Sequence, residues 1–307
     1  MSGDFIMEFI KVLIPIFGVF AIGFIGIKFL KFEIKPISTM ALYLMSPFLA
    51  FRTFYQNELN MDYLYLGAFL IALCLISIAV CYLISYFKKW DVADRSSLIL
   101  SSVFMNNGNY GTPLVLLVFG EKGFHYAIIL MVLQTLIMCT IGIYFAAQGG
   151  ISENEAKVSP IKEVIKVPIV YGAVLGILLN VINIEVTSDI MTAVNMVSDA
   201  TIPTVMIVLG MQLATISLKK LEVRKLSFSI VFRLIIGPVI AYFLTLPLPV
   251  DEMVKDILIL MAAMPTAANT TMYALQFDAK PEFVSSATLT STLLSVFTLP
   301  ILLMLIM

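Results

Sequence analysis

Long apolar runs separated by short polar connections make up most of this chain. Each run holds about 20 residues, which is long enough for a helix to cross the hydrocarbon core of a membrane. The runs lie near residues 7–29, 36–55, 62–87, 96–120, 123–147, 163–183, 187–213, 228–248, 253–277 and 283–306. The pattern therefore predicts an all-α polytopic membrane protein with ten transmembrane helices.

The fourth and ninth runs are each interrupted near the middle by polar and helix-breaking residues. The interruptions are Asn106–Pro113 and Pro265–Thr271. Proline removes a backbone donor and glycine weakens a helix, so backbone groups lose their partners at membrane depth. Such backbone is tolerated only beside protein or a water-filled cavity, and paired broken helices indicate a transporter's binding site. The predicted helix breaks are Gly108, Gly111, Pro113 and Pro265.

The longest polar connection, residues 148–162, lies at the midpoint of the chain and predicts a linker. It separates two predicted five-helix repeats, residues 1–147 and 163–307. Weak internal similarity supports this division, because Ile14–Gly18 in the first run resembles Val167–Gly172 in the sixth. An odd number of helices per repeat forces the halves into opposite orientations, which is the inverted-repeat plan of many secondary transporters.

Lysine and arginine residues gather on one side of this arrangement. They lie near residues 28–35, 88–95, 157–166 and 219–225 and at residue 280. The opposite connections carry only Arg52, Lys122 and Lys255. The positive-inside rule therefore predicts that the lysine-rich side and the linker are cytoplasmic and that both termini lie outside the cell (plasma) membrane. The amino-terminal run has no basic segment before it, so we interpret it as a retained helix.

The composition narrows the possible functions. Hydrophobic residues form 60% of the chain and charged residues only 13%, against roughly 25% charged in soluble domains. No basic stripe predicts nucleic-acid binding. The cysteines Cys74, Cys81 and Cys139 lie in apolar runs, and His125 is the single histidine, so we predict no metal site. No nucleophile and base pair is evident, which argues against an enzyme.

Polar residues around the two breaks are the candidate substrate ligands. Asparagine amides both donate and accept hydrogen bonds, and each break creates a new helix amino terminus that attracts an anion. The predicted substrate-binding residues are Asn106, Asn107, Asn109, Tyr110, Thr112, Thr266, Asn269 and Thr270. Two alternatives stay open: the asparagines satisfy backbone at a kink or hold neighbouring helices together, and the threonines bond back to their own helical turn. The density of polar residues at two matched breaks favours a site for a small carboxylate.

Asp199, near the middle of the seventh run, is a candidate coupling or cavity residue, because an ionisable group at that depth is costly. The alternatives are a solvated carboxylate that lines a cavity and an ion pair, with Arg233 as a conceivable partner. By the same logic Gln134 is predicted to face the bundle interior. Arg52 is interpreted as a residue that snorkels to the interface, or as one that attracts anions at the entrance.

Three segments of this sequence resemble the auxin efflux carrier family, specifically its short bacterial members, often called malate permeases. They are Asn106–Pro113, Ala262–Pro265 and Ile202–Leu213. The resemblance implies ten helices with outward termini. It also implies a scaffold of spans one, two, six and seven that is often dimeric. The remaining spans, three to five and eight to ten, would form a transport unit whose fourth and ninth helices cross at their breaks.

The same resemblance implies a substrate class. Plant members carry auxin anions, but they have a long central loop and a proline where Met105 stands here. Bacterial members are associated with dicarboxylates such as malate or malonate. We therefore expect a homodimeric carrier of a small organic anion that works by elevator-like alternating access without a cofactor. The more distant bile acid sodium symporters share the crossed helices, so coupling to Na⁺ or H⁺ stays open.

Two alternative functions remain at this point. One is a sodium-coupled symporter of a bile acid-like or other amphipathic anion. The other is a channel or sensor on the same fold, because a fold does not determine a function. The sequence lacks the rings of like charge or repeated filter segments that are typical of channels.

Overall fold

The computed structural model describes residues 2–30, 33–57, 61–150, 168–215 and 222–307. Within these ranges the chain is helical apart from short connections, and its only strand-like pairing is one isolated bridge. The all-α prediction is therefore confirmed for the described residues. Most of the predicted linker, residues 151–162, lies outside them.

The helices follow the apolar runs of the sequence. The first half contains α1 (Ser2–Leu30), α2 (Ile34–Thr39), the π-helix η1 (Met40–Met45), α3 (Ser46–Gln56), α4 (Asp62–Lys88), α5 (Val92–Ser102), η2 (Asn107–Gly111), α6 (Thr112–Ile137), η3 (Met138–Gly142) and α7 (Ile143–Gly149). The second half contains α9 (Pro168–Val181), α10 (Ser188–Thr215), α11 (Val223–Val231), η4 (Phe232–Ile236), α12 (Gly237–Thr245), α13 (Glu252–Ala262), α14 (Ala268–Phe277) and α15 (Pro281–Ile306). Five of the described helical segments are long and apolar enough to cross a membrane, and shorter apolar helices accompany them.

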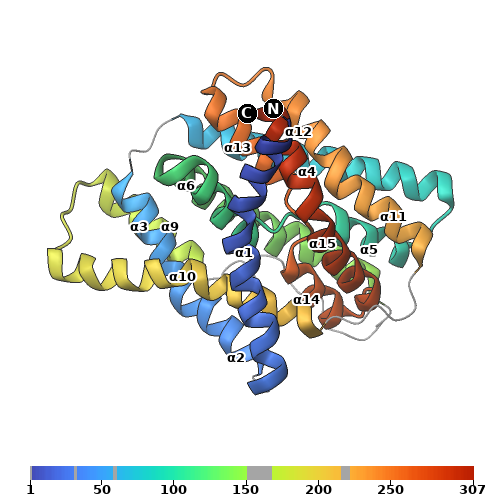
Figure 1. Ribbon diagram of the computed structural model, residues 1–307, viewed down its shortest axis with the longest axis horizontal. Coiled ribbons are helices and arrows are strands. Elements are labelled where there is room, and N and C mark those ends of the chain that lie inside the picture. Colours follow the sequence, from blue (N-terminus) through green and yellow to red (C-terminus); the bar gives the residue numbers. More distant parts are fainter. Residues whose placement is uncertain (1, 31–32, 58–60, 151–167, 216–221) are drawn as a thin grey trace.

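A break at Gly120 divides α6 where the sequence predicted a boundary between two runs. Gly120 has φ 65° and ψ −163°, a backbone conformation that glycine adopts readily because it has no Cβ atom and that other residues rarely adopt. The helix that follows the break in the fourth run therefore ends at Gly120, and a second helix continues from there to η3. The two ends of the whole chain lie at the same end of the molecule, where α1 runs beside α15 (Figure 1).

Four helices pack together through very close backbone contacts: α1 along α10, and α3 along α9. A Cβ atom added at Gly210 of α10 would lie 1.9 Å from the carbonyl oxygen of Phe20, and one at Gly23 of α1 would lie 2.0 Å from that of Ile207. Small residues let helix backbones approach in this way where lipid replaces water as the solvent. These helices correspond to the first, second, sixth and seventh runs.

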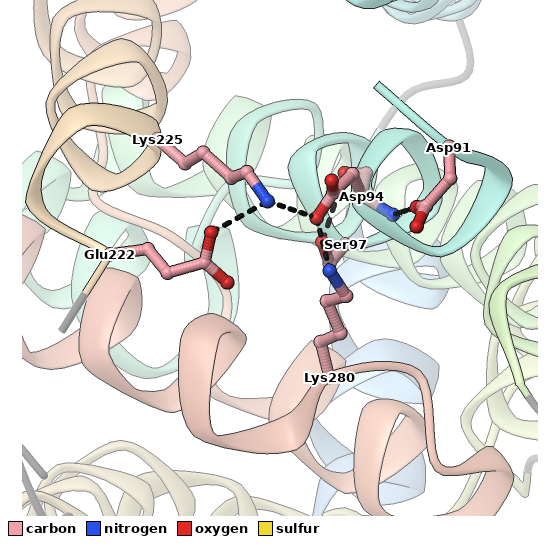
Figure 2. Close-up of polar contacts among 6 residues, drawn as sticks. All are labelled: Asp91, Asp94, Ser97, Glu222, Lys225 and Lys280. Carbon is pink, nitrogen blue, oxygen red and sulfur yellow. Dashed lines mark hydrogen bonds and ion pairs between the residues drawn. The ribbon is translucent and has the colours of Figure 1, made fainter. Parts of the chain in front are cut away.

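A cluster of charges joins α5, α11 and the start of α15 (Figure 2). The carboxylate of Asp94 accepts a hydrogen bond from Lys225 at 2.6 Å and another from Lys280. Burial raises the pKa of the Asp94 carboxyl, but the hydrogen bonds and charges of the two lysines outweigh burial, so the pKa lies below its ordinary value. The cluster fastens three helices together at one end of the molecule.

Candidate functional site

The two broken segments lie against each other. The backbone N–H of Asn106 donates to the carbonyl oxygen of Pro265 at 2.9 Å, and the N–H of Ala267 donates to that of Phe104 at 3.0 Å. These bonds form an isolated antiparallel bridge between Met105 and Thr266. Each break thus supplies partners for backbone groups of the other, which is how irregular backbone survives at membrane depth.

The carbonyl groups that end the helices before each break also have partners. Arg233, on η4, donates to the carbonyl oxygens of Ser102 and Val103 at 2.8 and 3.2 Å, and to that of Ala262. The hydroxyl of Thr266 donates to the carbonyl oxygen of Ser101 at 2.5 Å. The ends of α5 and α13 are therefore held together by one arginine.

A cavity of about 120 Å³ opens beside the paired breaks, and we call it the crossing cavity. Its walls come from α3, α9 and α10 on one side and from the breaks, α6 and η3 on the other. Its polar lining consists of Tyr43, Ser46, Asn106, Asn107, Asn109, Gln134, Thr135, Cys139, Thr201, Asn269 and Tyr273. Three of the π-helices, η1, η2 and η3, contribute to it, and such irregular turns occur frequently at functional sites.

Asn106 and Asn107 are buried in the wall of this cavity with unused hydrogen-bonding capacity. The side-chain oxygen of Asn106 accepts from the backbone N–H of Asn109 at 3.3 Å, which caps η2, but its amide nitrogen has no partner among the described residues. Neither polar atom of the Asn107 side chain has a partner there, although the residue is only 2% exposed. Buried polar groups are nearly always paired, so these atoms indicate room for a ligand. The alternative that the asparagines satisfy backbone at a kink therefore explains the side-chain oxygen of Asn106. It explains neither the amide nitrogen of Asn106 nor the side chain of Asn107.

The amino terminus of α14 faces the same cavity. This helix begins at Ala268 after Ala267, which makes no side-chain cap, and Ala267, Ala268 and Asn269 all line the cavity. Free N–H groups and the positive end of the helix dipole attract an anion to such a position. The site therefore offers dipoles and amides to an anion, while no lysine or arginine is among the described residues that line it.

Of the other predicted substrate-binding and coupling residues, Asn109, Gln134 and Asn269 line the crossing cavity, whereas Tyr110, Thr112, Thr266, Thr270 and Asp199 do not. Tyr110 is fully buried, packs against Phe17 and Phe20, and accepts a hydrogen bond from Ser295 at 3.1 Å. The structure places its ring between helices and not beside the cavity.

The three threonines predicted with Tyr110 have hydroxyl groups engaged within the breaks. Thr112 donates to the carbonyl oxygen of Asn107 at 2.6 Å, and Thr270 donates to that of Ala267 at 2.8 Å. Thr266 bonds to the end of α5 as described above. For Thr270 this is the back-bonding that threonine commonly makes within its own turn.

Asp199 does not line the crossing cavity. Its side chain is 70% exposed on α10 and pairs with Arg52 of α3 at 2.6 Å, which agrees with the ion-pair alternative but with a different partner. The neighbouring Ser198 and Thr201 are buried, so the helical periodicity turns Asp199 to the opposite face. Arg233, the partner considered from the sequence, is used at the breaks instead.

Several lining residues escaped the sequence analysis, including Tyr43, Ser46, Thr135 and Tyr273. The sequence does carry a signal in this part of the second run, because the Ser46-Pro47 pair places a helix-breaking proline inside the apolar run. Arg233 carried a clearer signal, since it is an ionisable residue inside an apolar run, but its partners could not be inferred from its position.

A second cavity of about 740 Å³ adjoins the first, and we call it the vestibule. The two share Tyr43, Ala268, Asn269 and Tyr273. The vestibule extends along the start of α2 and the ends of α10 and α14, and its lining also includes Ile34, Thr215 and Gln276. The crossing cavity therefore adjoins a wider space towards that end of the helices.

Comparison with known proteins identifies the family. The sequence profile of the family described as membrane transport protein matches residues 8–303. The chain belongs to this family. The resemblance to the auxin efflux carriers is thereby confirmed, and this membrane transport protein is an integral membrane transporter and not an enzyme.

Individual relatives agree with the family assignment. An uncharacterized transporter of Methanocaldococcus jannaschii is 26% identical over 85% of this chain and 86% of its own length. A protein of Rhizobium meliloti named "putative malonate transporter" is 23% identical over 97% of this chain and 96% of its own length. The chain thus aligns with both relatives over most of their length.

Proposed function

We propose that this membrane transport protein is a carrier of a small organic anion, a mono- or dicarboxylate such as malonate or malate. The observation that carries the proposal is Asn107, whose buried side-chain amide has no partner among the described residues and lines the cavity beside the paired breaks. A carboxylate there would accept from the amide nitrogens of Asn106 and Asn107 and lie near the amino terminus of α14.

The size of the crossing cavity favours a small substrate. Its volume is about 120 Å³, whereas pockets for drug-sized ligands hold about 300–1,000 Å³. An amphipathic, bile acid-like anion is therefore a poorer fit than a short carboxylate. The name of the Rhizobium meliloti relative points to the same substrate class.

For the mechanism, we propose a scaffold of α1, α2 to α3, α9 and α10, and a transport unit of α4 to α7 and α11 to α15. The crossing cavity lies between these two groups, so movement of one against the other would carry a bound anion across. The scaffold helices would form the contact of a homodimer in the cell membrane. Each group combines helices of two inverted five-helix repeats.

The charge pattern gives the orientation within this proposal. The vestibule opens between the ends of α2, α10 and α14 that adjoin the lysine-rich connections, and these connections are cytoplasmic by the positive-inside rule. The structure would then be an inward-facing state with both termini outside. A cysteine introduced at Lys89 should resist an impermeant thiol reagent added to intact cells, and one at Asn57 should react. The reverse labelling would invert the orientation.

Uptake by purified protein in liposomes tests the function. We expect saturable uptake of labelled malonate or another short carboxylate, and counterflow when the vesicles are preloaded with the unlabelled anion. Counterflow separates a carrier from a channel. In a carrier, the preloaded anion leaves on the same binding site that brings the labelled anion in, whereas a channel does not couple the two movements. Absence of saturable uptake for a panel of short carboxylates would overturn the proposal.

Variants locate the site in the same assay. Asn109→Ala or Asn269→Ala should abolish substrate binding while the fold is retained, because each removes hydrogen bonds that replace the hydration of the anion. The matched control is Asn195→Ala on α10, an asparagine that lines neither cavity. Unchanged transport in both test variants would remove the crossing cavity from the mechanism.

A further inference from the structure

Arg233 is a buried cation without an acidic partner among the described residues. The residue is 1% exposed, and the ion pairs of the described chain involve other side chains. Its guanidinium donates to the carbonyl oxygens of Ser102, Val103 and Ala262. A buried charge is costly unless it is compensated, so these carbonyl groups must supply the compensation.

The partial negative charge at the ends of two helices matches the positive charge of Arg233 in sign and in size. α5 and α13 have 11 residues each, and both end against the same guanidinium. A helix carboxyl terminus carries about −0.5 elementary charge, so two of them together balance one positive charge. The fold leaves room for this group, because a Cβ atom added at Gly237 would lie 2.8 Å from a terminal nitrogen of Arg233.

The carbonyl oxygens that Arg233 occupies are of the kind that bind coupling ions in transporters with broken helices. In such carriers the ends of half-helices and the unwound backbone beside them coordinate Na⁺. Here the same type of oxygen, from both broken helices, already accepts hydrogen bonds from a side chain of the protein.

We propose that Arg233 is the permanent cation of the crossing: it takes the place of a bound metal ion, holds the two broken helices together and makes substrate binding independent of Na⁺. The part that concerns substrate rests on the function proposed above, whereas the cation balance does not. Arg233 is a positioning residue, since it acts on the cavity through the backbone of the breaks. The positive charge also lies close to the start of the breaks, where it favours an anion over a cation.

Thermal unfolding of the purified full-length protein, without substrate, tests the cation balance. We expect the wild-type midpoint to be the same in sodium chloride and in choline chloride at equal ionic strength. Arg233→Ala should lower the midpoint by several degrees, and millimolar methylguanidinium should restore at least half of the loss. The matched control is Arg52→Ala, which removes the same side chain from an exposed ion pair and should show no such recovery.

Three results would overturn the inference. One is a wild-type midpoint that rises specifically with Na⁺, and another is an Arg233→Ala variant that keeps the wild-type midpoint. The third is a loss that neither methylguanidinium nor Na⁺ reverses, because removal of ordinary packing would behave in that way. If Arg233→Ala does not fold, Arg233→Lys must fold and keep a midpoint indifferent to Na⁺; failure of this variant also overturns the inference.

Uptake then connects the cation to transport. Replacing external Na⁺ with choline should leave the rate of carboxylate uptake by wild-type protein unchanged within twofold. A rate that requires Na⁺ would overturn the inference and leave the carrier function intact. Absence of all carboxylate uptake, with the unfolding results as expected, would instead refute the proposed function alone.

Discussion

Asn107→Ala should weaken substrate binding without weakening the fold. The side chain of Asn107 is 2% exposed and makes no hydrogen bond to the described residues, so its removal breaks no internal bond. A buried polar group without a partner costs about 1–3 kcal/mol, and its removal offsets the small cavity that alanine leaves. The thermal unfolding midpoint of the variant should therefore equal or exceed that of the wild type.

The expected loss of substrate affinity follows from the one hydrogen bond that the Asn107 amide would donate to a bound carboxylate. A hydrogen bond to a charged group contributes about 1.5–3 kcal/mol, and every 1.4 kcal/mol is roughly tenfold in affinity. Losing one amide bond to a carboxylate should raise the Kd for substrate roughly 10- to 150-fold. Isothermal titration with malonate, or whichever carboxylate the liposome assay selects, measures this directly.

The matched control for this prediction is Asn180→Ala. The Asn180 amide donates to the carbonyl oxygens of Tyr55 and Asn57 at 2.7 and 3.1 Å, so its loss should lower the unfolding midpoint and leave binding intact. The reasoning fails if Asn107→Ala binds substrate as tightly as the wild type. It also fails if that variant loses stability as the Asn180 variant does.

Three further predictions concern structure away from the cavity. Asp94→Asn should destabilise the protein by about 2 kcal/mol, between the values for exposed and buried ion pairs. Because the pKa of Asp94 lies below its ordinary value of 3.8, this stabilisation is present above about pH 4, and a pH series of unfolding midpoints should show it fading as the pH falls further. Gly210→Ala should cost about 1–3 kcal/mol in denaturant unfolding, since its Cβ would lie 1.9 Å from a carbonyl oxygen of α1; a neutral effect would show that α1 and α10 can separate freely. Asp199→Asn should leave the pH and Na⁺ dependence of uptake unchanged, because the carboxylate is exposed beside Arg52; a clear change would restore it as a coupling residue.

The sequence by itself determined where the helices lie and where they break. Apolar runs of membrane-spanning length are local features, and so are Pro265 and the asparagine and glycine residues that start at Asn106. Backbone groups of an interrupted helix at membrane depth need hydrogen-bond partners from other segments or from water. The same local pattern therefore predicted a polar region at the two breaks. The all-α class and the transporter family could both be predicted before any contact was known.

The tertiary structure decided which polar side chains are free to bind. Asn107 and Tyr110 stand three positions apart in one motif, yet the first lines the cavity and the second is locked between helices. That difference depends on how each helix face packs, and a motif does not encode its own rotation against neighbours. The same limit applies to Asp199, because its position in an apolar run did not show that its side chain would pair with Arg52 and lie away from the crossing cavity.

The pairing of segments that are far apart in the chain was the feature that the sequence could predict least. The bridge between Met105 and Thr266, and the bonds from Arg233 to both broken helices, join segments that are far apart in the chain. Each of these segments has unsatisfied backbone groups on its own, and many partners could in principle satisfy them. Only the packed bundle selects one set, because only there do two helix ends and one guanidinium come within hydrogen-bonding distance.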